Sequence, residues 1–361
     1  MTQRIKLFDP YIGTEEENAA SKIIKSRFWA SGAGTGQVSK FEKKFQRYLG
    51  CDDCIAVNSG TAALNLAMSL TEIKGYEVIL PSLTFVATAH SILVNGGKPI
   101  FVDVDQETNC IDPKKIENAI SKKTKAILPV HFGGMPCDIE KIQKICKNND
   151  LYLIEDAAHA AGASHGNKKI GSHGNFVCFS FHPVKNLAMP TGGLISINDR
   201  APKKFRKLLE SRRWCGITNR VDADYDVKEM GWNYYMNEIS AAIGLEQLKK
   251  LDKSNRIRKN IANKYHKKLN LEHKMPFNSD GVYHFFWIRV KSRAKFRKLM
   301  TNAGIETGIH YKPIHTMTMY KTKKKLNVTE QVGDEIVTLP THPGLRDKDV
   351  DYIIDCVNKF S

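Results

Sequence analysis

The chain has 361 residues, 42% of them hydrophobic, and 55 basic against 38 acidic residues give it a formal net charge of +17. This length and composition can bury a large core in one large and one smaller domain, which excludes a disordered chain. The charge suggests nucleic-acid binding as one hypothesis. However, the basic residues occur in short runs without interleaved aromatics, so we interpret them as solvated helix faces that attract anionic substrates.

Short apolar runs alternate with helical patterns along most of the chain. Seven runs are expected to form strands, at residues 54–57, 77–80, 99–103, 126–130, 151–155, 176–179 and 194–197. Four stretches between them are expected to form helices, at residues 61–70, 84–95, 113–121 and 139–148. Continuously apolar strands are typical of a mainly parallel sheet covered on both faces. The alternation of strands and helices therefore predicts a layered α/β domain.

A long amphipathic stretch, residues 237–269, follows the last predicted strand. We expect it to lead from the α/β domain into a smaller C-terminal α+β region. The predicted division places a large domain at residues 1–245 and a small domain at residues 246–361.

The eight cysteines do not form a disulfide framework in a chain of this length. Cys51 and Cys54 have C-x-x-C spacing, but no second pair follows at the distance of a zinc ribbon, so we expect reduced thiols and no metal site. The first residues lack the apolar core of a signal peptide, and no stretch reaches the apolar length of a membrane span. These features predict a cytoplasmic protein without a membrane partner.

Ligands of open α/β sheets bind beyond the carboxyl ends of the strands, so polar residues directly after strands are candidates. The segment 58–64 (NSGTAAL) follows one predicted strand and precedes a helix. Its small residues let an anion approach the backbone, and the amides at a helix start can bind phosphate. A helix merely capped by Ser59 or Thr61 is the alternative.

Two more polar segments follow predicted strands. Asp156 closes an apolar strand and could hold a protonated ring nitrogen, with His159 on the same side of a helical turn. An aspartate that caps a helix beside an interior histidine is the alternative. Lys185 lies on a loop marked by Pro183, where burial would lower its pKa and permit Schiff-base chemistry, although a surface lysine is the ordinary expectation. An anion cradle, an acid and a lysine together are what a pyridoxal phosphate site requires.

The chain resembles the DegT/DnrJ/EryC1/StrS family of sugar aminotransferases over nearly its whole length. The matching motifs, in the family's order, include residues 58–64 (NSGTAAL), 80–88 (LPSLTFVAT), 97–105 (GKPIFVDVD), 155–163 (EDAAHAAGA), 180–186 (SFHPVKN) and 231–238 (GWNYYMNE). The resemblance implies the fold-type I aminotransferase architecture. In it, a three-layer α/β/α large domain with a mainly parallel seven-stranded sheet is joined to a smaller C-terminal α+β domain. The resemblance also implies a homodimer with composite active sites.

The resemblance implies a role for each residue that matches a motif. Lys185 forms the Schiff base with pyridoxal 5′-phosphate and afterwards acts as general base and acid. Asp156 pairs with the pyridine nitrogen, and His159 lies near the phenolic oxygen of the ring. Phe85 stacks on the ring face, a common use of an aromatic plane.

The resemblance also assigns the cofactor's phosphate group. It is bound by the amides of Gly60 and Thr61 and by the hydroxyl of Ser180, and Asn233 is expected to arrive from the partner subunit. One departure from the family pattern is plain. Most members have an acidic residue before the Gly-Gly pair that follows the lysine, whereas this chain has Thr191.

The family reaction has two stages. An amino acid, usually glutamate, leaves its amine on the cofactor as pyridoxamine 5′-phosphate, and the amine then passes to a keto group, at C3 or C4, of a nucleotide-linked deoxy sugar. The segment 308–315 (GIHYKPIH) resembles the part of the family that lies near the sugar, although a strand with polar residues on its solvent face is an alternative. The candidate substrate residues are Trp29, His310, Tyr311 and His315.

Two other functions stay open at this point. Some relatives are sugar dehydratases, but these carry histidine at the position of Lys185, so the lysine favours transamination. A basic nucleic-acid-binding protein on an aminotransferase scaffold is the third hypothesis. The sequence has no helix-turn-helix, RNA-binding or zinc-finger signature, which makes nucleic acid a poor candidate partner.

Overall fold

The computed structural model describes residues 4–322 and 324–361. A seven-stranded sheet forms its centre, with strand order β1-β9-β8-β5-β4-β2-β3. The strands are β1 (Asp53–Val57), β2 (Glu77–Pro81), β3 (Lys98–Val102), β4 (Thr124–Ile127), β5 (Tyr152–Asp156), β8 (Phe176–Ser180) and β9 (Gly193–Ile197). Strand β9 is antiparallel to both of its neighbours, and every other pairing in this sheet is parallel. The predicted mainly parallel seven-stranded sheet is therefore confirmed.

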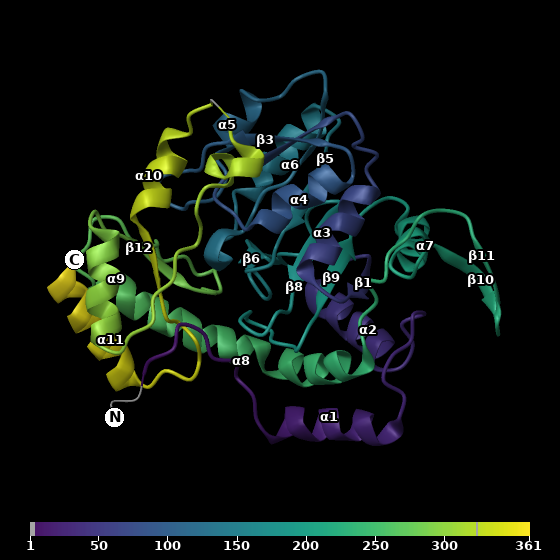
Figure 1. The fold of residues 1–361 in the computed structure, drawn as a ribbon, viewed down its shortest axis with the longest axis horizontal. Helices are drawn as coiled ribbons and strands as arrows, with labels where there is room; N and C mark the ends of the chain where they lie inside the picture. The colour runs from purple at the N-terminus through teal and green to yellow at the C-terminus, as the bar shows by residue number, and fades with distance from the viewer. Residues whose placement is uncertain (1–3, 323) are drawn as a thin grey trace.

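Helices lie on both faces of the sheet (Figure 1). They are α2 (Gln37–Leu49), α3 (Gly60–Ser69), α4 (Val86–Val94), α5 (Pro113–Glu117), α6 (Ile139–Asn148) and α7 (Pro202–Arg212). Helix α1 (Thr14–Ser26) instead packs on the long helix Glu238–Lys268. Successive side chains of a strand point to opposite faces, so both faces need an apolar cover. In β1, Ile55 packs in the cluster that contains α3 residues, while Ala56 packs in the cluster that contains α2 residues. These three layers agree with the predicted α/β/α architecture.

Helix α8 (Glu238–Lys268) runs beneath both parts of the molecule (Figure 1). Its first half packs against α1 and α2, and its second half packs on the C-terminal part. That part consists of β12 (Phe286–Arg289), α9 (Arg293–Asn302), α10 (Asn327–Glu335), β13 (Ile336–Leu339) and α11 (Asp347–Phe360), and β12 pairs with β13 antiparallel. The predicted boundary between the two domains, after residue 245, falls inside α8, which contacts both parts. The division into domains 1–245 and 246–361 stays a prediction.

The remaining elements are short. They are the strand pairs β6 (Ser164–His165) with β7 (Lys168–Lys169) and β10 (Ile217–Val221) with β11 (Asp224–Val227), and the 3₁₀ turns η1 (Phe132–Gly134), η2 (Ile314–Thr316) and η3 (Thr318–Tyr320). The hairpin β10–β11 projects from the body of the molecule beyond α7 (Figure 1). Within the described ranges, no helix combines the length and apolar composition needed to cross a membrane.

Buried charges close the open side of the edge strand β1. The Glu42 carboxylate accepts a hydrogen bond from the Ala56 amide at 2.9 Å and binds the Arg213 guanidinium at 2.8 Å. Arg213 in turn donates to the Ala56 carbonyl at 2.9 Å. The side chains of Glu42 and Arg213 are 3% and 1% exposed. An unpaired edge is a site for unwanted strand pairing, and here side chains satisfy it instead.

We expect the substitution Glu42→Ala to destabilise the protein by about 3–5 kcal/mol, because it leaves the buried Arg213 without its counter-charge. The midpoint of chemical denaturation measures this loss. The matched control is Glu246→Ala, which breaks the exposed pair with Lys249 and should cost less than about 1 kcal/mol. Equal midpoints for the two variants would show that the Glu42 pair does not hold the edge of the sheet.

Candidate active site

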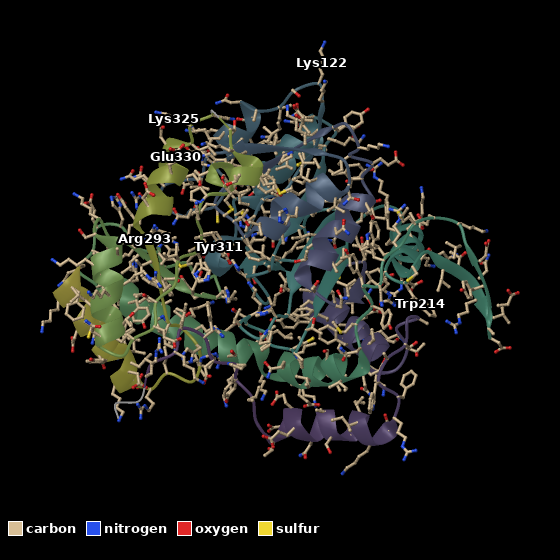
Figure 2. All side chains as sticks on the ribbon, in the orientation of Figure 1. Lys122, Trp214, Arg293, Tyr311, Lys325 and Glu330 are labelled. Carbon is tan, nitrogen blue, oxygen red and sulfur yellow. The ribbon has the colours of Figure 1, made fainter. Side chains whose placement is uncertain are left out.

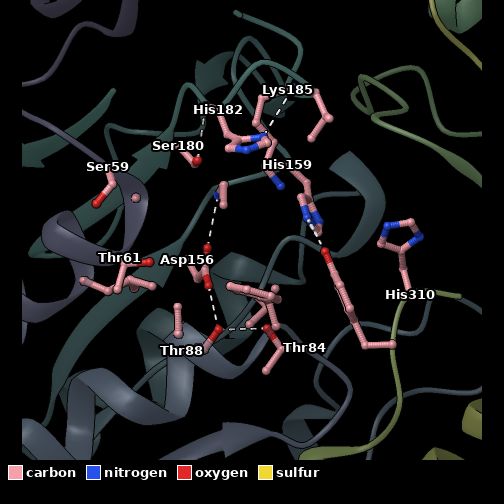
Figure 3. A pocket seen from close by; sticks show the side chains of 18 of the residues that line it. Ser59, Thr61, Thr84, Thr88, Asp156, His159, Ser180, His182, Lys185 and His310 are labelled. Carbon is pink, nitrogen blue, oxygen red and sulfur yellow. Dashed lines mark hydrogen bonds between the residues drawn. The ribbon is translucent and has the colours of Figure 1, made fainter. Parts of the chain in front are cut away.

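A cavity of about 340 Å³ lies at the carboxyl ends of the parallel strands. Its walls come from loops after β1, β2, β5 and β8, from the residues just before β9, and from the C-terminal part of the chain (Figure 3). Because β9 runs antiparallel, its first residues lie at the same edge of the sheet as the ends of the parallel strands. Segments far apart in sequence thus meet at one edge, as expected for open α/β sheets.

The loop between β1 and α3 forms one end of the cavity. The Ser59 hydroxyl accepts a hydrogen bond from the Ala62 amide at 3.1 Å, and the Ser59 carbonyl accepts one from Ala63 at 3.0 Å. Because a helix has no internal partners for its first amides, those of Gly60 and Thr61 are left to bind an anion. Any side chain at Gly60 would clash, since a Cβ there would lie 2.6 Å from the Ser180 Cβ. The helix cap and the anion cradle therefore coexist in this loop.

Asp156 ends β5 and points into the cavity (Figure 3). Its carboxylate accepts hydrogen bonds from the Thr88 hydroxyl at 2.8 Å and from the Ala158 amide at 3.1 Å. Burial raises the pKa of Asp156, and the two hydrogen bonds and the charge of Lys185 oppose that rise. A buried carboxylate held this way is a suitable partner for a cationic ring nitrogen.

Lys185 extends into the same cavity from the loop after β8 (Figure 3). The loop is a turn in which the Lys185 amide donates to the His182 carbonyl at 2.8 Å. Burial lowers the pKa of the Lys185 ammonium to about 8, and the nearby charge of Asp156 limits the drop. A large part of the lysine is therefore neutral at mildly alkaline pH, and a neutral amine is the form that attacks a carbonyl.

His159 lies on the opposite side of the cavity from the anion cradle (Figure 3), and Tyr311 lines the cavity beside it. The His159 Nδ1 accepts a hydrogen bond from the Gly133 amide at 3.3 Å, so the neutral ring carries its proton on Nε2. That Nε2–H donates to the Tyr311 hydroxyl at 3.1 Å. Burial holds the pKa of His159 well below its usual value, so the ring stays neutral.

The structure brings most of the predicted site residues into this one cavity. They are Gly60, Thr61, Phe85, Asp156, His159, Ser180, Lys185, His310 and Tyr311. Three predicted residues do not line it. His315 is buried elsewhere, with its Nδ1 2.6 Å from the Ser82 hydroxyl and its Nε2 3.2 Å from Glu330. Trp29 and Asn233 are exposed to solvent on the single chain.

Thr84, Thr88 and His182 line the cavity but are not among the predicted site residues. The hydroxyls of Thr84 and Thr88 lie 2.8 Å apart, within hydrogen-bond distance, and the Thr88 hydroxyl donates to the Asp156 carboxylate. Thr84 and Thr88 lie in the polar segment after β2, so their place after a strand of the sheet is the signal that could have found them. His182 directly follows the end of β8, and it has no comparable signal of its own.

The fold and the cavity together define a class of protein. A mainly parallel sheet carries, at one edge, an anion cradle, a buried aspartate and a lysine of lowered pKa, which are the groups that hold pyridoxal phosphate. The fit is close at the anion end, because Gly60 and Gly193 keep that end free of side chains. A Cβ at Gly193 would lie 2.3 Å from the Ser59 carbonyl oxygen.

Comparison with known proteins identifies the family. The family model described as the DegT/DnrJ/EryC1/StrS aminotransferase family matches residues 10–358, and the chain belongs to this family. It is 34% identical to the GDP-perosamine synthase of Escherichia coli O157:H7 over 364 residues, which cover 99% of this chain and 98% of that protein.

Two solved structures of other proteins are similar over nearly the whole chain. The aminotransferase PseC of Helicobacter pylori, involved in the biosynthesis of pseudoaminic acid, has a TM-score of 0.93 at 26% identity, and the match covers 99% of each chain. The putative sugar aminotransferase Spr1654 of Streptococcus pneumoniae in its PLP form has the same TM-score and identity, with 99% and 98% of the chains covered. A PMP form of that protein matches equally well. The chain is therefore a sugar aminotransferase that uses pyridoxal 5′-phosphate.

A stack of aromatic rings supports His159 from behind. The centroid of the His284 ring lies 4.6 Å from that of the His159 ring. The Phe8 ring also stacks on His284, with the ring centroids 5.1 Å apart. His284 is 1% exposed, and its Nδ1 has no hydrogen-bond partner among the described residues. Burial therefore holds the pKa of His284 well below its usual value of 6.5.

We expect this stack to make the protein less stable in mild acid. The unfolded chain binds a proton at His284 below about pH 6.5 and the folded chain does not, so stability falls as the pH falls from 6.5. Because the unfolded histidine is already half protonated at pH 6.5, the loss between pH 6.5 and 5.5 is about 1 kcal/mol for this residue. Chemical denaturation at pH 6.5 and 5.5 measures it. In His284→Phe, which keeps a ring in the stack, the difference between the two pH values should shrink by that amount, and an unchanged difference would contradict the assignment.

Proposed function

We propose that the protein transfers an amino group, with glutamate as donor, to a keto group at C3 or C4 of a nucleotide-linked deoxy sugar. The observation that carries the proposal is the meeting of Lys185 and Asp156 in one cavity beside an anion cradle. The name of the relative GDP-perosamine synthase supports a nucleotide-linked sugar as the substrate. The excess of basic residues favours an anionic substrate of this kind.

Each residue of the cavity has a proposed part. When bound, the cofactor supplies an electron sink for the carbon that loses or gains the amine. Lys185 would bind the cofactor covalently through Nζ and, once released, would take a proton from the reacting carbon and return it. The lowered pKa suits this work, since Nζ exchanges a proton readily near pH 8.

Three further groups would orient the cofactor for that proton transfer. Asp156 would hold the ring nitrogen in its cationic form, supported by the hydroxyl of Thr88. Phe85, which lines the cavity and is 55% exposed on the single chain, would cover one face of the ring. The amides of Gly60 and Thr61 and the Ser180 hydroxyl would bind the phosphate group.

The sugar would bind at the side of the cavity formed by His159, His310 and Tyr311. His159 donates its proton to the Tyr311 oxygen, so the hydroxyl proton of Tyr311 remains available for an oxygen atom of the sugar. Burial and the charge of Lys185 hold the pKa of His310 at about 4, so this ring is neutral at working pH. The proposed contacts to the sugar are therefore hydrogen bonds from neutral groups.

The experiment that tests the function incubates the purified holoenzyme with glutamate and a panel of 3-keto and 4-keto nucleotide sugars. An amino sugar nucleotide as product, identified by mass spectrometry, supports the proposal and fixes the carbon position. A deoxygenated product would instead identify a dehydratase. No reaction with any keto sugar nucleotide, from an enzyme that does accept the amine of glutamate, would reject this substrate class.

We also propose that the active site is completed by a second copy of the chain. Apolar side chains lie exposed at the N-terminal segment and on the hairpin β10–β11, including Phe28, Trp29, Val221 and Tyr225. Exposed apolar groups of this size favour an interface. Asn233 is exposed close to the base of the hairpin, where its chain pairs with that of Trp214, and would reach the phosphate site of the partner subunit. The cytoplasmic location stays a prediction.

Mixing two inactive variants tests this arrangement. A heterodimer of Lys185→Ala and Asn233→Ala subunits contains one site with both Lys185 and an Asn233 contributed by the other chain. Activity should therefore reappear on mixing and unfolding–refolding the two variants together. If Asn233 acted within its own subunit, no site of the heterodimer would be complete and the mixture would stay inactive.

A further inference from the structure

Thr191 lies two residues before β9 and lines the cavity. Its hydroxyl donates a hydrogen bond to the carbonyl oxygen of Asn58, the residue that leads into the anion cradle. A carboxylate accepts hydrogen bonds and cannot donate one, so an acidic residue at this position could not make the contact. The structure thus gives Thr191 a partner that its position in the sequence did not suggest.

Asn58 is held by this and three other hydrogen bonds, one of which comes from the Ser59 hydroxyl to its side-chain oxygen at 3.3 Å. Its amide donates to the Tyr234 carbonyl at 2.7 Å, and its side-chain amide donates to the Asn233 carbonyl at 3.2 Å. The Thr191 hydroxyl donates to the backbone carbonyl oxygen of Asn58. The peptide plane between Asn58 and Ser59 is therefore held at its carbonyl oxygen, and Asn58 itself is held at its amide and side chain.

The orientation of this plane decides where the cradle amides point. Ser59 is extended, with φ −164° and ψ 160°, and turns the chain directly into α3. The strand that begins after Thr191 packs against the same turn, since a Cβ at Gly193 would lie 2.3 Å from the Ser59 oxygen and 2.8 Å from the Gly60 nitrogen. Without the Thr191 hydroxyl, the Asn58 carbonyl would lose its partner and the plane would be free to tilt.

We propose that Thr191 is a positioning residue for phosphate binding: its hydroxyl holds the Asn58 carbonyl and so aims the Gly60 and Thr61 amides at the phosphate group. The inference rests on the proposed phosphate cradle. It adds that the same clamp joins the cradle to the segment of Asn233, which would serve the site of the partner subunit. One hydroxyl then aligns groups that belong to two sites.

The test measures the binding of inorganic phosphate to the cofactor-free protein. A ligand that binds only the folded state raises the melting temperature with concentration, so a phosphate titration in a phosphate-free buffer gives the dissociation constant. We expect Thr191→Val, which keeps the shape and removes the hydroxyl, to raise this constant about 5- to 10-fold. Thr191→Ser restores the hydroxyl and should stay within about 2-fold of the unchanged protein.

Ser196→Ala is the matched control. Ser196 lies on β9, the strand that Thr191 leads into, is fully buried and donates to the Gly171 carbonyl at 2.7 Å, but it does not line the cavity. Its loss should lower the starting melting temperature without changing the phosphate dissociation constant. The inference fails if Thr191→Val binds phosphate as tightly as the unchanged protein, if Thr191→Ser is as weak as Thr191→Val, or if Ser196→Ala weakens phosphate equally.

This test does not depend on the sugar substrate. Phosphate binding is measured without glutamate, keto sugar or turnover, so a wrong substrate class would leave its result unchanged. Conversely, an enzyme that aminates keto sugars but shows no effect of Thr191→Val on phosphate would retain the proposed function and lose this inference. If the unchanged protein binds no phosphate at all, the cradle and the inference fail together.

Discussion

Replacing Lys185 with alanine is expected to lower kcat for keto-sugar amination by about 10³-fold or more. The substitution removes the amine that would both carry the cofactor and move the proton at the reacting carbon, and a positioned acid–base group alone contributes about 10²–10⁴-fold. Borohydride reduction followed by mass spectrometry of the Lys185 peptide measures the covalent link directly. The unchanged protein should retain cofactor mass on this peptide, and the variant should retain none on any peptide.

A matched lysine shows whether the effect belongs to the site. Lys122 is exposed and projects from the surface of the molecule (Figure 2), so Lys122→Ala should leave kcat unchanged. The lowered pKa of Lys185 adds a second expectation. Nζ must be neutral to attack the cofactor, so the rate at which cofactor-free protein forms the covalent link should rise with pH, with its midpoint near pH 8. Normal turnover in Lys185→Ala would reject the assigned role.

The substitution Asp156→Asn is expected to produce the second largest effect. An amide of the same shape cannot stabilise a cationic ring nitrogen by charge, and the loss of one such electrostatic contact costs on the order of 10²-fold in kcat. Steady-state kinetics of the variant, with the bound cofactor quantified by absorbance, separates a slower reaction from a poorly filled site.

Two further variants test whether the effect on kcat is specific to the Asp156 carboxylate. Thr88→Val removes one hydrogen bond to the carboxylate and should cost about 10-fold at most, because the Ala158 amide still holds the other oxygen. Asp351→Asn changes an exposed carboxylate on α11 and should have no effect on kcat. If Asp156→Asn kept full activity with the site filled, the ring nitrogen would have to be stabilised by another group.

The strands and most helices were predictable because their apolar runs have the period and length that a covered parallel sheet demands. The expected helix at 84–95 shows the limit of this reasoning. The structure begins α4 at Val86, and Phe85 keeps an extended backbone with φ −72° and ψ 146°. Thr84 and Phe85 thereby stay outside the helix and line the cavity. Side-chain periodicity is insensitive to this displacement of the helix start by two residues.

The segment 308–315 shows a second limit. Its two histidines occur in one short motif and looked equally suited to bind the sugar. The structure turns His310 toward the cavity and His315 toward Ser82 and Glu330. The segment contains neither an α-helix nor one of the named strands, so no period relates its side chains. Contacts with distant parts of the chain, such as Ser82, Glu330 and Thr338, decide where each histidine points.

By itself, the sequence determined the α/β class, the family and the lysine, aspartate and glycine-rich loop of the site. These features are local, because each lies at the end of an apolar strand or in the loop that follows one, at the edge of the sheet. Only the tertiary structure decided which polar groups are hydrogen-bonded to one another. Thr88 donates to Asp156, and Thr191 donates to Asn58. The Gly133 amide donates to His159, which in turn donates to Tyr311. These partners are separated by 26 to 152 residues. A hydrogen bond depends on distance and direction in space, and neither is encoded in the spacing of residues along the chain.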